Sequence, residues 1–466
     1  MDPRHEHVNE GNTRKKLPRA SIVNKKVLAW SAWDWGFAAF NAVATTFVFS
    51  VYLTSGLFGD KDMASGALAN GLTIAGIVIA LLAPISGQRA DRKGKGTFWL
   101  GVNTYLVVAL MFLIYFVAPE SPLGKTGALW LGIAILGLGN VFFEFASVNY
   151  NAMLGRISTP ETMGRISGLG WGAGYVGGIV LLLFLYFGFI NPEVGLFGVT
   201  SENGLDIRVA MLISAAWFGL SAIPVLTTIR GRKHKDAHMD KHESIITSYK
   251  LLWRTVKRLA KEAPHSLFFL AASAVFRDGL AGVFTFGAIL AAGVFGFSAG
   301  EVLIFGVAAN VVAGIATIAF GALDDLLGPK TVIIFSLTCM VISGLCVFFF
   351  HNGVGGLSPH VVFWIFGLLL CIFVGPSQSA SRSFLARVIP EGREGEVFGL
   401  YATTGRAVSF LAPLMFSVFL SIGKAIEGPE VSSQHWGILG IVLILLAGLL
   451  MMIPVKAEKA HLGSMK

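Results

Sequence analysis

The chain of 466 residues has the composition of a membrane protein and not of a soluble one. Hydrophobic residues make up 54% and charged residues 14% of it, with a mean hydropathy of +0.70, whereas an ordinary soluble domain carries about 25% charged residues. The net charge of +9 falls in short loops, where anionic lipid and insertion topology explain it, and this excludes nucleic acid as a partner.

Apolar segments long enough to cross a bilayer recur twelve times. A helix needs about 20 residues to cross ~30 Å of hydrocarbon, and the first segment is too long for a signal peptide. The sequence therefore predicts an all-α membrane protein with twelve transmembrane helices. The predicted spans are 28–53, 66–86, 97–117, 128–149, 166–190, 209–229, 267–292, 300–323, 330–350, 360–380, 397–422 and 435–454.

The positions of lysine and arginine orient these spans. When residues 1–27 are taken as a basic cytosolic tail, most of the 36 basic residues fall in the tails and loops of the cytosolic side. This bias follows the positive-inside rule, so both termini are predicted to be cytosolic, with the plasma or inner membrane as the location. The opposite loops hold only Lys61, Lys125, Arg208 and Lys424, and Arg277 and Arg406 lie inside spans.

One longer polar segment, residues 230–264, divides the spans into two bundles of six, 28–229 and 265–454, and residues 455–466 form a cytosolic C-terminal tail. The apolar residues of the segment recur at helical spacing among lysines and arginines. This pattern predicts a basic amphipathic helix that lies on the inner leaflet. We interpret the segment as a linker between the bundles, with regulation or partner binding as the alternative.

The sequence contains no recognisable cofactor, metal or catalytic site. Three cysteines lie inside apolar runs and are interpreted as small core residues: Cys339, Cys346 and Cys371. Three histidines spaced along one helical face are interpreted as solvated polar residues: His234, His238 and His242. Since no nucleophile–base grouping or phosphate-cradling turn is present, we do not expect an enzyme.

Two aspartates lie inside spans at related places in the two halves. Asp34 is in the first span and Asp278 in the seventh. A charged residue in a span is costly, and intramembrane carboxylates often belong to proton relays. Either aspartate is therefore a candidate to couple transport to a proton gradient, and a structural ion between helices is the alternative.

A short motif occurs after the second span and again after the eighth, about half the chain length later. A glycine, an acid four residues on, a second glycine and a base predict a tight turn at the membrane surface. Each aspartate is expected to cap the positive N-terminus of a helix from the other half. The residues are Gly87, Asp91, Arg92, Gly94 and Lys95 in the first copy and Gly321, Asp325, Gly328 and Lys330 in the second.

Polar residues form patches in spans 4 and 10. In span 4 they are spaced by four, three and four residues and share one helical face. Because a polar stripe against lipid is costly, we expect both patches to border a central cavity. The patches are Asn140, Glu144, Ser147 and Asn151 in span 4 and Ser377, Gln378, Ser381 and Arg382 in span 10, with Arg382 expected near a surface.

The two remaining intramembrane charges are arginines. Arg277 is adjacent to Asp278 but points about 100° away around the helix, so we expect it to pair across helices, with Glu144 or with substrate. Arg406, in span 11, is the other cation able to hold a carboxylate. An anchor at the end of its helix is the alternative interpretation of Arg406.

The two six-span halves, the basic link and the GxxxDRxGxK turn resemble the major facilitator superfamily. More specific strings look like the Unknown Major Facilitator family, which includes the autophagy-related vacuolar amino-acid effluxers of yeast. The resemblance implies alternating access, with the turn contacts latching an inner gate, and efflux of amino-acid-like cargo. The second turn departs from the pattern at Leu326 and Pro329, and Glu144 stands in span 4 where proton-coupled relatives often have arginine. The strings are Trp30–Trp35, Tyr150–Leu154, Ser377–Ser383 and Phe398–Tyr401.

Together these patterns predict a secondary active transporter of a small organic solute, with proton-coupled efflux as its expected mode. One alternative is a lipid or drug exporter of the same fold, and another is a membrane receptor or scaffold that transports nothing. The expected partners are the solute, protons and membrane lipids, and we expect a monomer without a cofactor.

Overall fold

The computed structural model describes residues 23–59, 61–229, 245–297, 299–389, 393–428 and 434–456. Within these ranges twelve helical segments are long and apolar enough to cross a membrane, which confirms the predicted number of spans. Each overlaps one predicted span. They are Lys25–Thr54, Asn70–Arg92, Gly96–Phe116, Gly124–Ile157, Met163–Ile190, Glu202–Thr228, Pro264–Ala291, Ile304–Leu327, Pro329–Phe349, Pro359–Val388, Glu394–Glu427 and Gln434–Met452.

Several spans consist of more than one helical element. Spans 1 to 6 contain α1 (Lys25–Ala38), η1 (Ala39–Phe47) and α2 (Phe49–Thr54); α3 (Lys61–Arg92); α4 (Gly96–Leu113) and η2 (Ile114–Phe116); α5 (Gly124–Ala152) and α6 (Leu154–Ile157); α7 (Met163–Leu185) and η3 (Tyr186–Ile190); and α8 (Leu205–Thr228), preceded by η4 (Leu196–Gly198) and η5 (Glu202–Gly204). After α9 (Ile245–Glu262), spans 7 to 12 contain α10 (Pro264–Gly293); α11 (Ala299–Leu327); α12 (Pro329–Phe349); α13 (Pro359–Ile372) and α14 (Val374–Val388); α15 (Glu394–Val408) and α16 (Leu411–Glu427); and η6 (Gln434–Trp436) and α17 (Gly437–Met452).

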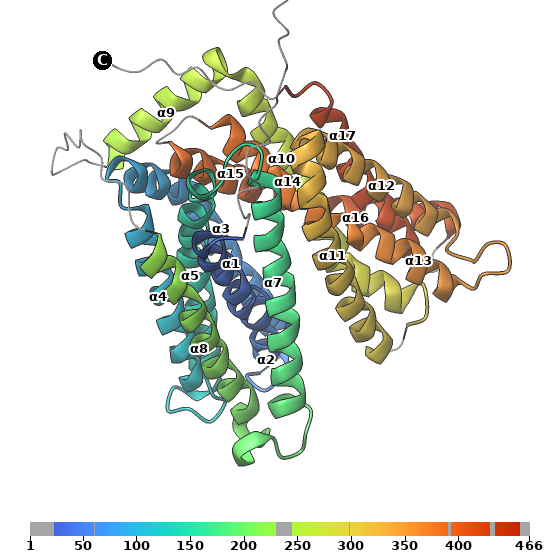
Figure 1. The fold of residues 1–466 in the computed structure, drawn as a ribbon. Helices are drawn as coiled ribbons and strands as arrows, with labels where there is room; N and C mark the ends of the chain where they lie inside the picture. The colour runs from blue at the N-terminus through green and yellow to red at the C-terminus, as the bar shows by residue number, and fades with distance from the viewer. Residues whose placement is uncertain are drawn as a thin grey trace, which may run out of the picture.

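The helices fall into two groups. Figure 1 shows α1 to α8 on one side and α10 to α13, α16 and α17 on the other, with α14 and α15 between them and α9 across one end. We refer to the end that carries α9 as the cytosolic end, following the charge distribution. Each group has its own apolar core, with Trp30 and Phe218 in the first and the stacked rings of Phe269 and Phe384 in the second.

The repeated motif is mostly helical, which differs from the predicted tight turn. α3 continues through Arg92, so the turn is confined to Lys93–Lys95, where Gly94 has a φ of 60°. In the second copy α11 ends at Leu327, and Gly328, with a φ of 85°, leads directly into α12. Glycine is suited to both positions because it adopts a positive φ without a steric penalty.

Several spans are interrupted, and the interruptions in spans 1 and 11 lie beside the contacts described below. Residues Ala39–Phe47 of span 1 form a π-helix, in which the hydroxyls of Thr45 and Thr46 donate to the Asn41 carbonyl. Span 11 breaks between α15 and α16, which leaves the N-terminal amides of α16 without partners in their own helix. Such interruptions are often found at functional sites.

The two halves meet along two helix pairs, α3 with α15 and α7 with α11. The backbones approach so closely that a Cβ atom added to Gly87 would overlap the Gly395 carbonyl, and one added to Gly168 would lie 2.6 Å from the Thr317 carbonyl oxygen. Both contacts lie toward the cytosolic end. The absence of side chains at these glycines therefore allows this end to close.

Pro84, inside α3, supports the first of these pairs. Proline has no N–H, so the carbonyl four residues earlier loses its helical donor. That carbonyl, on Ala80, instead accepts from the Thr403 hydroxyl of α15 at 3.0 Å. The contact between α3 and α15 thus replaces a hydrogen bond that α3 cannot make alone.

Candidate functional site

Three layers of polar contacts join the two halves, and the first lies nearest the cytosolic end. Asp91 accepts from the backbone N–H of Glu396 at 2.9 Å, at the start of α15. Asp325 accepts from the N–H groups of Gly164 and Arg165 at 2.7 and 3.1 Å, at the start of α7. Each carboxylate satisfies amides that a helix start leaves unpaired and adds a favourable charge there. These are the cross-half caps that the sequence predicts.

The second cap is reinforced by residues that the sequence reasoning did not select. Arg387 donates to Asp324 at 2.5 Å and to Asp325 at 3.0 Å, and Arg165 lies 3.4 Å from Asp325. Ser383 also donates to Asp324. The repeat of Leu-x-Arg after spans 4 and 10 was a signal for Arg387, but spacing alone does not reveal its acidic partners.

The lysines of the two turns lie elsewhere. Lys330 donates to the Ile453 carbonyl at 2.6 Å, within the second half. Lys95 lies 5.9 Å from the centre of the Phe98 ring. Arg92 is exposed at the end of α3, and its charge interacts with that of Glu396 in α15. The aspartates and glycines of the motif, more than its lysines, therefore form the contact between halves.

The second layer is a buried ion pair between Asp34 of α1 and Arg382 of α14. Arg382 Nη1 lies 3.3 Å from Asp34 Oδ2, and the side chains are 5% and 8% exposed, respectively. Arg382 also donates to the Ser167 hydroxyl and carbonyl at 3.0 and 2.7 Å, and to Asn151 at 3.4 Å. These partners belong to the first half, so one side chain of the second half is held by three helices of the first. Arg382 thus lies toward the cytosolic end of its span, buried between the halves.

Aromatic rings surround this ion pair. The Arg382 guanidinium lies 4.7 Å from the Trp30 ring centre, and Tyr150 stacks between Trp30 and Trp33 at 4.5 and 4.3 Å. The ring of Trp33 is fixed by its N–H, which donates to Thr104 at 3.0 Å. These rings exclude water, and charges attract more strongly where water is excluded.

The third layer lies deeper and is less buried. Arg406 pairs with Glu144 at 3.3 Å, with side chains that are 38% and 20% exposed, respectively. Arg406 lies twelve residues after the start of α15, which places it about 18 Å along that helix from the cytosolic end. Both charged groups therefore lie in the central part of the membrane, where solvent still reaches them.

This third layer borders a polar cavity of about 240 Å³. The cavity lies between α15 and the helices of spans 1, 2 and 4. The interrupted part of span 1 contributes Asn41 and Thr45, beside the Asn140 amide of α5. Its lining residues are Asn41, Thr45, Leu72, Gly76, Ile79, Asn140 and Arg406.

The predicted polar patches are divided between these layers. In span 4, Asn140 lines the cavity, Glu144 pairs with Arg406, and Asn151 accepts from Arg382. The span-4 stripe thus faces the second half along its length. By contrast, none of the span-10 patch lines this cavity. Arg382 is in the second layer, Ser381 is bonded to the Tyr401 hydroxyl at 2.7 Å, Ser377 donates to the Phe373 carbonyl, and Gln378 is half-buried on α14.

Arg277 and Asp278 act within the second half. Arg277 lies over the Tyr401 ring at 3.7 Å and donates to the Tyr401 carbonyl at 3.2 Å, so the suggested pairing with Glu144 was wrong. Asp278 accepts from the Ala412 N–H at 2.6 Å. Its carboxylate therefore caps α16 at the break in span 11, and its environment differs from that of Asp34.

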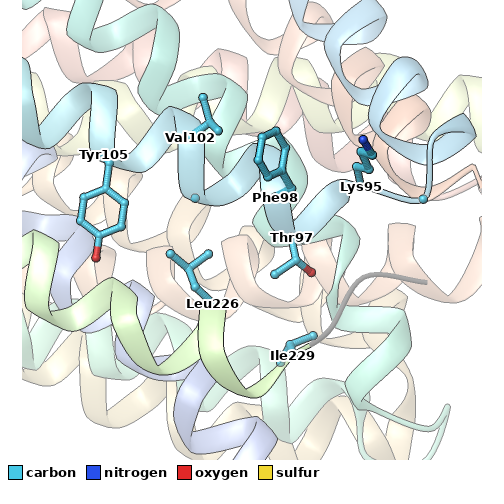
Figure 2. A pocket seen from close by; sticks show the side chains of 9 residues that line it. Lys95, Thr97, Phe98, Val102, Tyr105, Leu226 and Ile229 are labelled. Atoms are coloured by element: carbon cyan, nitrogen blue, oxygen red, sulfur yellow. The ribbon is translucent and has the colours of Figure 1, made fainter. Parts of the chain in front are cut away.

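A second hollow, of about 640 Å³, lies between α4 and α8 on the side of the first group away from α10–α17 (Figures 1 and 2). Phe98, Tyr105 and Leu226 line it, and Lys95 marks its cytosolic end in Figure 2. The hollow is separate from the three layers. In the part of the chain that the structure describes, no group of three His, Cys, Asp or Glu side chains is arranged to hold a metal ion; His234, His238 and His242 lie outside that part.

Known proteins resemble this chain in sequence and in structure. A family model described as "Vacuole effluxer Atg22 like" matches residues 57–462. YxiO, an uncharacterized MFS-type transporter of Bacillus subtilis, is 26% identical over 426 residues, which cover 90% of this chain and 94% of that protein. Autophagy-related protein 22-1 of Neosartorya fischeri is 25% identical over 269 residues, or 54% of this chain, and the match spans only 43% of the fungal protein.

Two solved structures have a similar arrangement of helices. The proton:xylose symporter XylE, of the major facilitator superfamily, matches with a TM-score of 0.68 at 14% identity, over 94% of this chain and 97% of that one. A bacterial homologue of the iron transporter ferroportin in its outward-facing state matches with a TM-score of 0.66 at 14% identity, over 93% and 99%. At such identities the likeness concerns the fold alone.

Proposed function

Because this chain belongs to the Atg22-like vacuole effluxer family and has the twelve-span major facilitator fold, we propose that it moves a small organic solute across the membrane by alternating access. The chain is a multi-pass membrane protein of the MFS transporter type. Cargo, coupling and direction are proposals, and they rest on the three polar layers.

Alternating access is supported by the contrast between the layers. The first two are buried and tie the halves together at the cytosolic end, whereas the third is partly exposed and borders a cavity. A transporter needs one closed side and one solvated site between its halves. In this proposal the described conformation is the one closed to the cytosol, and rocking of the halves breaks the first two layers.

The cavity supports a small zwitterion, such as an amino acid, as cargo. Arg406 and Glu144 place opposite charges 3.3 Å apart at a solvated position, and Asn41, Thr45 and Asn140 add polar groups. A substrate carboxylate can replace Glu144 on Arg406, while a substrate ammonium group pairs with Glu144. The volume of about 240 Å³ is below the 300–1,000 Å³ that is usual for drug-sized ligands.

We expect Arg406→Gln to weaken solute binding while leaving the fold intact. A hydrogen bond to a charged group is worth about 1.5–3 kcal/mol, so the apparent affinity should fall roughly 10- to 100-fold. Arg406→Lys should bind with intermediate affinity, because lysine keeps the charge but loses the fork geometry. Binding is measured by thermal shift in a screen of amino acids, followed by uptake into proteoliposomes.

Lys424→Gln is the matched control, since it removes one basic charge outside the cavity. Wild-type uptake by the Arg406→Gln variant would contradict this substrate site. Stabilisation by amphiphiles alone would favour the alternative of lipid or drug export. The observation that favours lipid or drug export is the apolar hollow between α4 and α8, which Figure 2 shows. If none of the tested solutes is transported, the alternative of a receptor or scaffold would be favoured.

For the coupling proton, Asp34 is a better candidate than Asp278. A proton on Asp34 removes the charge that faces Arg382 and so weakens the second layer, which links protonation to opening. Asp278 instead caps a helix within one half. Asparagine can also accept at a helix N-terminus, so Asp278→Asn retains that function.

We therefore expect Asp34→Asn to lose uptake driven by a pH gradient but to keep solute exchange, and Asp278→Asn to keep both. The measurement compares proteoliposomes with and without an imposed gradient. Unchanged gradient-driven uptake in Asp34→Asn would exclude Asp34 as the proton carrier. Loss of this uptake in Asp278→Asn alone would instead assign the proton to Asp278, the cap of α16. Efflux, from the cytosolic side of a plasma or inner membrane, is the direction that we propose.

A further inference from the structure

Helix α9 lies across the cytosolic end of the molecule (Figure 1) and packs against α3 and α10. The side of α9 that faces the protein is buried, and its residues are Ser248, Leu252, Thr255 and Leu259. They are spaced by four, three and four residues and so form one face of the helix. The residues on this face fix how α9 is rotated on the protein, and therefore which side chains it presents outward.

The buried face of α9 contacts both halves. Ser248 accepts from Arg89 Nε of α3 at 3.1 Å, and Thr255 accepts from Arg393 Nη1 at 2.9 Å. Arg393 is the residue before α15, whose first turn is capped by Asp91. The helix therefore bridges the two elements that meet in the first polar layer.

The outer surface of α9 carries two parallel rows of side chains. One is apolar, with Ile246, Tyr249 and Trp253 exposed by 66%, 37% and 60%. The other is basic and exposed, and its members are Lys250, Arg254, Lys257 and Lys261. Trp253 and Lys257 join the rows, with Lys257 Nζ 5.5 Å from the Trp253 ring. An apolar edge beside a basic edge is typical of a helix that lies in the membrane interface.

The depth of α9 agrees with that location. The Tyr249 hydroxyl donates to the carbonyl of Leu81 at 2.8 Å. Leu81 is in span 2, eleven residues before the end of α3, and its apolar side chain is 54% exposed. Because Leu81 belongs to the apolar part of span 2, the Tyr249 ring extends from α9 to the level of the acyl chains.

We propose that α9 binds the anionic phospholipid headgroups of the inner leaflet, and that the bound helix holds α3 against α15. The basic row matches anionic headgroups in charge, while the apolar row enters the acyl boundary. Since α9 contacts Arg89 and Arg393, lipid that fixes α9 also favours the conformation in which the first layer is formed. Binding of lipid does not require the solute proposed above, so the two proposals can fail independently.

Lipid binding is tested on the full chain with its three cysteines replaced and a single cysteine introduced as Trp253→Cys. An environment-sensitive fluorophore on this cysteine is compared in vesicles of phosphatidylcholine and of phosphatidylcholine with phosphatidylglycerol. We expect a blue shift in the anionic vesicles and no shift for the same label at Thr247→Cys, which lies away from the apolar row.

Replacing Lys250, Lys257 and Lys261 by glutamine should remove the blue shift. The matched control replaces Lys25, Lys26 and Lys456, which are exposed residues of the predicted cytosolic side, and should leave the shift unchanged. Equal spectra in the two kinds of vesicle, or equal loss in the control, would overturn the proposal. A fluorophore that reports water in both kinds of vesicle would also overturn the proposal, and would favour a protein partner for this surface.

Coupling between lipid binding and closure of the cytosolic end is measured separately, from the reactivity of a cysteine introduced as Ser379→Cys. Ser379 is 2% exposed and contacts Ser167 of the other half at 3.0 Å, so a cysteine there reacts with maleimide only when the cytosolic end opens. We expect about tenfold slower reaction in anionic vesicles, equivalent to ~1.4 kcal/mol, and loss of this difference in the triple glutamine variant. Lipid binding without any change in this rate would overturn the coupling.

Discussion

Replacement of Arg382 by alanine should open the cytosolic end of the protein. Arg382 and Asp34 are both nearly inaccessible to solvent, and removing one partner of a buried ion pair costs about 3–5 kcal/mol, because the other charge stays buried. That cost applies only to the closed conformation, since opening gives Asp34 access to water. We expect maleimide to react with Ser379→Cys at least about 100-fold faster in the Arg382→Ala background.

Two variants distinguish this explanation from general loss of packing. Arg165→Ala removes an arginine whose side chain is 37% exposed. Asp325 keeps Arg387 and two backbone N–H donors in this variant, so no buried charge is left without a partner. The substitution should change the rate only slightly. Asp34→Asn combined with Arg382→Ala should react more slowly than Arg382→Ala alone, because no charge is left buried. An unchanged rate in Arg382→Ala would show that the second layer does not hold the halves together.

The substitution Gly87→Val should prevent the same end from closing, through contact and not through charge. An added Cβ would overlap the carbonyl of Gly395, so α3 and α15 must separate. Overpacking of this kind typically costs about 1–3 kcal/mol. We expect solute flux to fall about tenfold or more, with faster reaction of Ser379→Cys and with binding of solute retained.

Gly287→Val is the control, because it places the same side chain on α10 where an added Cβ meets no atom within 4 Å. It should leave both flux and cysteine reactivity close to those of the parent. Normal flux in Gly87→Val would mean that the close approach of α3 and α15 is not needed in the transport cycle. Loss of solute binding in that variant would instead indicate damage to the cavity.

The twelve spans could be predicted because hydropathy and charge bias are properties of whole segments. The cross-half caps of Asp91 and Asp325 were also accessible, since the motif occurs twice and an acid at a helix start has an evident electrostatic role. In both cases the signal is carried by residues close together in the chain or repeated within it.

The remaining parts of the candidate site depend on contacts between distant residues. Arg382 follows the predicted end of span 10 at residue 380, and its burial was not foreseen because α14 continues to Val388 and carries the arginine between the halves. That extension is rich in serine and arginine, and hydropathy does not register it. Similarly, the sequence suggested Arg277 as a partner of Glu144, and only the packing of α5 against α15 places Arg406 there.

The break in span 11 was hidden for a different reason. Both α15 and α16 contain enough apolar residues to resemble one continuous span, so composition gives no sign of the interruption at Ser409 and Phe410. The role of Asp278 as a cap follows only once the break is known. Its equivalence to Asp34, inferred from position, therefore does not extend to its contacts.

The reciprocal caps have a consequence for the origin of this architecture. Asp91 of the first half binds the start of α15, and Asp325 of the second binds the start of α7, at positions that match in the repeat. In an isologous homodimer, each subunit makes this same exchange with its twofold mate. A single six-helix ancestor could thus have assembled in pairs through this contact before its gene was doubled, and fusion would have preserved a subunit interface inside one polypeptide.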